Sequence, residues 1–136
     1  MFTPEIIYFA QEAEASLQSN TGLNLVIAAN YGGQWDITES AKKIAIDVSN
    51  GALDPDNINA ALFNQYTALS GLPEVDLLIR TSGEVRLSNF LLWDLAYSEF
   101  YFSKTLWPDF NEQSLDDAIL DFHSRDRRFG ERNGEE

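Results

Sequence analysis

Residues 75–89 read VDLLIRTSGEVRLSN, an apolar run that changes abruptly into a small polar loop with two arginines. The run VDLLI is typical of a short buried strand. In open α/β sheets, ligands bind beyond the carboxyl ends of the strands, so the loop that begins at Arg80 is a candidate ligand site. The stretch therefore predicts a fold class, α/β, and the position of a site within it.

Helical and strand patterns alternate on both sides of this stretch. Apolar residues at helical spacing predict five helices, over residues 4–19, 36–48, 54–69, 90–97 and 114–122. Asp36 forms a capping box with Glu39 at the start of the second helix, and Ser114 with Asp117 caps the last one. The runs at 23–29 and 98–103 predict two further strands, and the first is apolar on both parities, as in a strand covered on both faces. The alternation predicts a parallel sheet covered by helices. Three strands make a thin sheet, so we expect it to belong to a larger sheet or an intimate oligomer.

Composition disfavours a nucleic-acid-binding protein, a zinc protein and a membrane protein. The 136 residues carry a formal net charge of −13, which disfavours general binding to nucleic acid or anionic membranes but allows one local phosphate site. There is no cysteine, which fits a reducing cytosol and leaves almost no ligands for a structural zinc site. No apolar run approaches the roughly 20 residues of a membrane span, so we expect a soluble, cytoplasmic protein.

The residues of the loop after VDLLI are suited to binding an anion. Arg80 and Arg86 lie six residues apart among small hydroxyl side chains, and Ser88 or Asn89 is placed to cap the helix predicted from Phe90. Guanidinium groups and a free helix N-terminus suit a phosphate or diphosphate. The alternative is that the two arginines only pair with Glu84 and Asp76 at a surface turn.

Other candidate residues leave alternatives open. The other four arginines cluster near the end, where they either complement the last helix's dipole or reach an anion: Arg125, Arg127, Arg128 and Arg132. Gly32 and Gly33 either let backbone approach a ligand or form a tight turn. Glu99 is either a solvated strand residue or a carboxylate able to hold Mg²⁺ beside a diphosphate. His123 is expected to have a packing or surface role.

Several motifs together resemble the cis-prenyltransferase family, and most of all its bacterial undecaprenyl diphosphate synthase branch. The segments are LNLVIAANYGGQWDI, DLLIRTSGEVRLSNFLLWDLAYSEFYF, LWPDF and RDRRFG, in the family's order from about Thr21 to Gly130. The resemblance implies that residues 1–130 are the C-terminal part of a cis-prenyltransferase domain and that residues 131–136 are a polar tail. It implies an enzyme that joins isopentenyl diphosphate units to an allylic diphosphate, giving undecaprenyl diphosphate as a cell-wall glycan carrier.

The resemblance also implies roles for individual residues. Arg80, Arg86 and Ser88 are expected to bind the diphosphate of isopentenyl diphosphate, and Glu99 to help place Mg²⁺ across a homodimer. Arg128 and Gly130 of the RxG ending are expected to approach the partner subunit's site. We expect the main dimer contact around residues 90–102, where six aromatic residues are more than one thin sheet needs for its own core.

The sequence departs from the family's pattern in two places. Asp94 stands where the motif usually has glutamine. No segment matches the family's glycine-rich loop, with its essential aspartate and an HGNGRW-like segment, that holds the allylic diphosphate. We therefore expect the chain to begin midway through the domain, to contain no catalytic aspartate and to be inactive alone. The alternative is a non-catalytic subunit or interaction module that pairs with a complete prenyltransferase.

Overall fold

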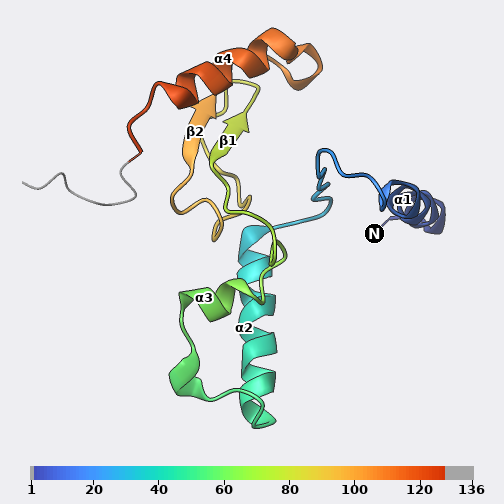
Figure 1. Ribbon diagram of the computed structural model, residues 1–136, viewed down its shortest axis with the longest axis vertical. Helices are drawn as coiled ribbons and strands as arrows, with labels where there is room; N and C mark the ends of the chain where they lie inside the picture. Colours follow the sequence, from blue (N-terminus) through green and yellow to red (C-terminus); the bar gives the residue numbers. More distant parts are fainter. Residues whose placement is uncertain (1, 128–136) are drawn as a thin grey trace, which may run out of the picture.

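A computed structural model describes residues 2–127, and its centre is a two-stranded parallel sheet (Figure 1). Strand β1 (Leu77–Arg80) pairs with β2 (Glu99–Phe102) in register, so that Arg80 lies opposite Phe102. Both strands were predicted from sequence, and the α/β class with a small parallel sheet is confirmed.

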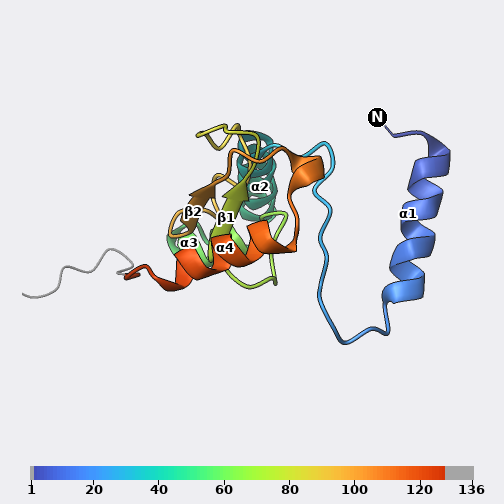
Figure 2. The same ribbon diagram turned by 90° about the horizontal axis from the view of Figure 1, so that it is seen from above.

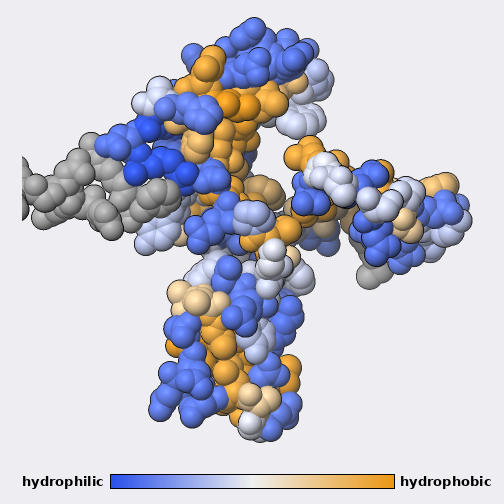
Figure 3. Space-filling view, viewed as in Figure 1, coloured by the Kyte–Doolittle hydropathy of each residue, from blue (hydrophilic) through white to orange (hydrophobic). Residues whose placement is uncertain are grey.

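Helix α4 (Glu112–His123) contacts β2 and lies along the sheet in both views (Figures 1 and 2). It follows the short 3-10 helix η2 (Trp107–Asp109). Ala118 is fully buried, and Figure 3 shows apolar side chains gathered between α4 and the strands. The N-cap is Asn111, whose Oδ1 accepts from the Ser114 amide at 3.0 Å, so the helix begins two residues before the predicted cap at Ser114. An asparagine in extended backbone supplies the cap here.

Helix α2 (Gly33–Ser49) forms a second unit with the segment that follows it, which contains η1 (Pro55–Asn57) and α3 (Ala60–Asn64). The buried Ser40 hydroxyl donates to the Tyr66 carbonyl at 3.0 Å, and the Tyr66 hydroxyl donates to Asp47 at 2.6 Å. The single helix predicted from Asp54 to Leu69 was wrong. Asn59 interrupts it in extended backbone (φ −143°) and caps α3 instead. The capping box predicted from Asp36 was also wrong, because α2 begins three residues earlier.

The helix predicted from Phe90 does not form in the described chain. Ser88, Asn89 and Leu91 have positive φ values of 49°, 63° and 43°, which interrupt helical geometry, and residues 90–97 form successive turns. Leu91 and Leu95 are buried in these turns, so tertiary packing outweighs the helical spacing of the aromatic residues.

Asn89 instead closes the N-terminus of α2. Its backbone carbonyl accepts from the Gly33 amide at 2.7 Å, and its side-chain Oδ1 accepts from the Gln34 amide at 2.8 Å. Two of the helix's unpaired N–H groups are therefore satisfied by a residue 55 positions away in sequence.

Replacing Asn89 with alanine should lower the free energy of unfolding by about 1–2 kcal/mol, because the Gln34 amide loses its cap. Asn89→Asp keeps an acceptor oxygen at the positive end of α2 and should retain most of the stability. Urea unfolding followed by tryptophan fluorescence measures both. Equal losses in the two variants would show that the side-chain oxygen is not the stabilising feature.

Helix α1 (Pro4–Leu17) stands apart from the other elements, joined to them by an extended segment (Figure 2). Residues 2–30 are all exposed. The strand predicted over residues 23–29 was wrong for this structure: a strand needs a neighbour, and among residues 2–127 only β1 and β2 pair. No helix within residues 2–127 is both long enough and apolar enough to cross a membrane.

Candidate functional site

The loop that follows β1 borders an open hollow of about 320 Å³, lined by residues from the strand's end and from both sides of the loop: Leu78, Ile79, Arg80, Thr81, Ser82, Glu84, Leu87 and Phe90. The start of the loop is held against the segment after β2. The Ser82 amide donates to the Thr105 carbonyl at 2.8 Å, and the Gly83 amide donates to the Ser103 carbonyl at 2.9 Å. The hollow thus lies at the carboxyl end of the parallel sheet, as expected from sequence.

Arg80 and Arg86 lie in different surroundings. Arg80 lines the hollow directly. Arg86 has a side chain that is 65% exposed, and its Nη1 pairs with Glu84, which does line the hollow. An exposed pair of this kind contributes little to stability, so its arginine is available to another anion. The alternative from sequence was that the two arginines pair with Glu84 and Asp76. The pair with Glu84 is observed, whereas Asp76 pairs with Arg127 at 2.6 Å.

Ser88 and the amides of α2 bear on how an anion would be held. Ser88 is exposed in left-handed backbone, between Arg86 and Asn89. No helix begins at Phe90 to offer free N–H groups, and Asn89 occupies the amides of Gly33 and Gln34. The amides of Gly33 and Gln34 are therefore not available to an anion, whereas the guanidinium and hydroxyl groups of the loop are charged or polar groups that suit one.

The glycines of NYGGQW are explained by close packing inside the chain. A Cβ added to Gly33 would lie 2.8 Å from Leu92 Cγ and 2.9 Å from the Leu92 backbone nitrogen. At Gly32 it would lie 2.8 Å from Asn89 Nδ2. The two glycines therefore let the turns at residues 89–92 pack against the first turn of α2.

Glu99 is held by an arginine. Its Oε2 lies 2.8 Å from Nη1 of Arg125, and Arg125 Nη2 also donates to Asp121 at 2.5 Å and to the Phe100 carbonyl at 3.0 Å. These hydrogen bonds to Glu99 and Asp121 raise the pKa of Arg125. Within residues 2–127, no three acidic or histidine side chains lie close enough to hold a metal ion together. The carboxylates near Arg125 in the described part of the chain are Glu99 and Asp121, which are fewer than a complete metal site needs.

The C-terminal arginines are described only in part. Arg125 ties α4 to β2, and Arg127 lies over the Phe122 ring at 5.2 Å from its centroid. His123 is exposed and lies edge-on to Phe122 with ring centroids 5.7 Å apart, as expected of a packing or surface residue. The predicted site residues Arg128 and Gly130, like Arg132, lie outside the described residues.

A pair of carboxylates near α2 was not singled out from the sequence. Asp36 is 4% exposed and accepts from the Tyr31 hydroxyl at 2.8 Å and from the Ala68 amide at 3.0 Å. Oδ2 of Asp94 is buried and has no hydrogen-bond partner among residues 2–127. Burial, and then the nearby Asp36 charge, raise the pKa of Asp94 above its ordinary value of 3.8. An acid inside the apolar run FLLWDLAY was the available signal.

Asp94 should make stability depend on pH. A carboxyl group whose pKa is higher in the folded state favours folding while it is protonated, and that contribution is lost as pH rises above about 4. Relative to the wild type, Asp94→Asn should therefore gain stability as pH increases from 4 to 7, by about 1 kcal/mol at neutral pH because the residue is only half-buried. Urea unfolding across this range measures it, with the exposed Asp116→Asn as control. A difference independent of pH would contradict the assignment.

Comparison with known proteins identifies the family. The family model described as "Putative undecaprenyl diphosphate synthase" matches residues 1–130. The chain belongs to the undecaprenyl diphosphate synthase family. It is 57% identical over 119 residues to the ditrans,polycis-undecaprenyl-diphosphate synthase ((2E,6E)-farnesyl-diphosphate specific) of Aliivibrio fischeri, and 51% identical over 120 residues to that of Escherichia coli. These alignments cover 88% of this chain but 46% and 47% of the relatives, so the chain spans about half their length.

Solved structures of the family share the fold. A lavandulyl diphosphate synthase from Lavandula x intermedia, in complex with dimethylallyl diphosphate, matches with a TM-score of 0.88 and 46% identity over 94% of this chain and 56% of its own. A probable undecaprenyl diphosphate synthase from Campylobacter jejuni matches with a TM-score of 0.77 and 29% identity, over 96% and 58%. The resemblance stated from the motifs is confirmed, and the family is one of transferases.

Proposed function

We propose that these 136 residues form the isopentenyl diphosphate site and the dimer surface of an undecaprenyl diphosphate synthase. The observation that carries the proposal is the hollow at the carboxyl end of β1, with Arg80 in its wall and Arg86 one ion pair away. In a chain with a net charge of −13, two cations at one parallel-strand end are well suited to a local anion.

The proposed contacts follow from the chemistry of a diphosphate. Arg80 and Arg86 would bind its oxygens through paired N–H groups, with Arg86 exchanging its Glu84 carboxylate for phosphate. Ser88 would contribute its hydroxyl. These contacts orient isopentenyl diphosphate so that its double bond faces the second substrate. For that second substrate we propose farnesyl diphosphate, the specificity named for the bacterial relatives.

In the proposed reaction, the C–O bond to the allylic diphosphate breaks and the double bond of isopentenyl diphosphate attacks the allylic carbon. A new C–C bond forms, and a proton is lost from the condensed unit. Repetition would give undecaprenyl diphosphate, the carrier lipid of cell-wall glycans. The residues of this chain would bind and orient the isopentenyl unit that adds at each step.

Mg²⁺ is the cofactor we propose, with Glu99 as one of its ligands. When bound, Mg²⁺ neutralises diphosphate charge. A magnesium ion takes one or two protein carboxylates together with phosphate oxygens, so Glu99 would be sufficient as this chain's ligand. Arg125 would have to give up its 2.8 Å contact with Glu99, and its bonds to Asp121 and to the Phe100 carbonyl would keep it in place.

The assembly we propose is a cytoplasmic homodimer. Residues 1–130 would be its C-terminal domain part and residues 131–136 a polar tail. Around residues 90–102, Phe90 and Tyr97 are exposed, whereas Trp93 packs inside the chain on Phe63, with ring centroids 4.4 Å apart. The exposed aromatic residues favour a contact there. Arg128 and Gly130 would approach the partner subunit's site.

Isothermal titration of the 136-residue chain with isopentenyl diphosphate tests the proposal. The chain should bind this ligand but should not elongate farnesyl diphosphate. Arg80→Gln should weaken binding by about 10-fold or more, because a charge-assisted contact is worth about 1.5–3 kcal/mol. Lys42→Ala removes one positive charge from an exposed pair with Glu39 on α2 and should leave affinity nearly unchanged. Equal affinities for the wild type and Arg80→Gln would contradict the proposed site.

A further inference from the structure

Asn89 lies between the proposed anion site and helix α2. It directly follows Ser88, and it precedes Phe90, which lines the hollow after β1. Its backbone carbonyl and its side-chain Oδ1 accept from the first two amides of α2, those of Gly33 and Gln34. The first turn of α2 is therefore bonded to the chain at the wall of the hollow.

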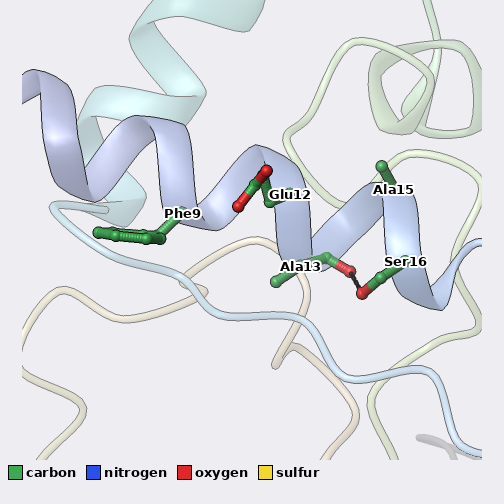
Figure 4. Close-up of a pocket in the computed structure, with 5 residues that line it drawn as sticks. All are labelled: Phe9, Glu12, Ala13, Ala15 and Ser16. Carbon is green, nitrogen blue, oxygen red and sulfur yellow. Dashed lines mark hydrogen bonds between the residues drawn. The ribbon is translucent and has the colours of Figure 1, made fainter.

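A second hollow, of about 740 Å³, lies beside α1 and is a poorer place for an anion. Its lining residues come from that helix alone: Phe9, Glu12, Ala13, Ala15 and Ser16 (Figure 4). Glu12 is the one charged side chain among these five, and it is negative. An anion is better suited to the hollow after β1, which has Arg80 in its wall.

The backbone at position 89 restricts which residue can stand there. Asn89 has a φ of 63°, in the left-handed region that glycine, asparagine and aspartate adopt most readily. The contact with the Gln34 amide also requires a side-chain acceptor oxygen, which glycine lacks. Asparagine and aspartate meet both requirements, and they differ in charge.

The charge at position 89 matters because an anion is expected beside it. Consecutive Cα atoms lie about 3.8 Å apart, whereas exposed charges interact over about 10 Å at 0.1 M salt. A carboxylate at position 89 would therefore repel a diphosphate bound at the Ser88 hydroxyl. The loop already contains Glu84, paired with Arg86, and the first turn of α2 contains Asp36. The neutral amide of Asn89 closes the helix without adding a further negative charge.

We infer that Asn89 is a positioning residue for the diphosphate, and that its neutrality determines how tightly the site binds an anion. Its side-chain oxygen holds the Ser88 end of the loop on α2. Because the side chain is uncharged, it does not oppose the attraction of Arg80 and Arg86 for the ligand. The inference rests on the proposed isopentenyl diphosphate site and adds to it a residue that acts without touching the ligand.

Asn89→Asp separates charge from capping, because aspartate caps a helix about as well as asparagine does. Isothermal titration of the 136-residue chain with isopentenyl diphosphate should give a dissociation constant about 10-fold higher for this variant than for the wild type. The ratio should fall to about 3 as salt is raised from about 0.05 M to about 0.5 M, since salt screens exposed charges. The urea midpoint should stay close to that of the wild type, because position 89 is exposed and lies at the positive end of α2.

Two other variants serve as controls. Asn59→Asp makes the same substitution at the cap of α3, where Asn59 Oδ1 accepts from the Leu62 amide at 3.0 Å. Helix α3 packs on α2, away from the sheet in Figure 1, so the affinity should stay within about 2-fold of the wild type. Asn89→Ala removes the acceptor oxygen without adding a charge. It should lower the urea midpoint and weaken binding, with the salt dependence of the wild type.

Several results would overturn the inference and leave the proposed function standing. Equal affinities for the wild type and Asn89→Asp, or equal losses in Asn89→Asp and Asn59→Asp, would show that charge at position 89 does not act on the ligand. A loss in Asn89→Asp that is independent of salt, or a urea midpoint as low as that of Asn89→Ala, would assign the effect to structure. Wild-type affinity in Asn89→Ala would show that Asn89 does not position the loop. A wild-type chain that does not bind isopentenyl diphosphate would overturn the proposed function and this inference together.

Discussion

Replacing Arg86 with alanine should lower kcat/KM for isopentenyl diphosphate by about 10-fold to 100-fold in an enzyme assembled from this chain and the unmatched half of the Aliivibrio fischeri synthase. The physical reason is the loss of one charge-assisted contact to phosphate, worth about 1.5–3 kcal/mol. Little of this loss should be structural, because Arg86 is 65% exposed and its ion pair within residues 2–127 is with Glu84 at the surface. Incorporation of radiolabelled isopentenyl diphosphate measures the effect.

Two further measurements isolate the role of Arg86. Lys42→Ala changes the net charge equally and should leave kcat/KM within about 2-fold of the wild type, since Lys42 pairs with Glu39 on α2, outside the hollow. The unfolding free energy of Arg86→Ala should stay within about 0.5 kcal/mol of the wild type. An unchanged kcat/KM, or the same loss in both variants, would show that Arg86 does not bind the substrate.

Gly33→Ala should lower the free energy of unfolding by about 2–3 kcal/mol, the larger of the expected effects on stability. The added Cβ would lie 2.9 Å from the Leu92 backbone nitrogen, and backbone cannot move aside as a side-chain end can. The clash would also push residues 89–92 away from α2 and lengthen the 2.7 Å bond from the Gly33 amide to Asn89. Because the described core is small, this would be a large share of the total stability.

Gly22→Ala is the matched control for this prediction. A Cβ at Gly22 meets no atom within 4 Å, so the substitution should change the unfolding free energy by less than about 0.5 kcal/mol. Urea unfolding followed by tryptophan fluorescence compares the two variants. If Gly33→Ala is as stable as the wild type, the turns at residues 89–92 do not pack as closely on α2 as the distances indicate.

Local sequence pattern was enough where the element's own neighbours are present. The runs VDLLI and SEFYF predicted β1 and β2, which pair with each other within the described chain. Apolar spacing predicted α2 and α4, with differences of a few residues at their ends, and it also predicted α1, which stands apart but whose backbone hydrogen bonds lie within the helix. The position of Arg80 beside a hollow also followed from sequence, since the carboxyl end of a parallel strand could be located in advance.

Local sequence pattern gave wrong predictions where contacts with distant residues determine the backbone conformation. The spacing of Phe90, Trp93 and Tyr97 predicted a helix, but the contact of Asn89 with α2 and the burial of Leu91 favour turns with positive φ. The run LNLVIAA has the composition of a buried strand, yet it remains extended and unpaired because no neighbour lies within the described residues. The capping of α2 from residue 89 has no local signature, and for the Asp36 and Asp94 pair the sequence offers only an acid inside the apolar run FLLWDLAY.

The anchoring of the loop between Arg80 and Asn89 has a consequence for ligand affinity. Near its start, Ser82 and Gly83 are bonded to the chain after β2, and at its end Asn89 is bonded to the first turn of α2. A loop fixed at both ends has few conformations left to lose when a ligand arrives. Association is then opposed mainly by the immobilisation of the ligand itself. Such preorganisation would let a strongly acidic protein hold a small anion with only two guanidinium groups.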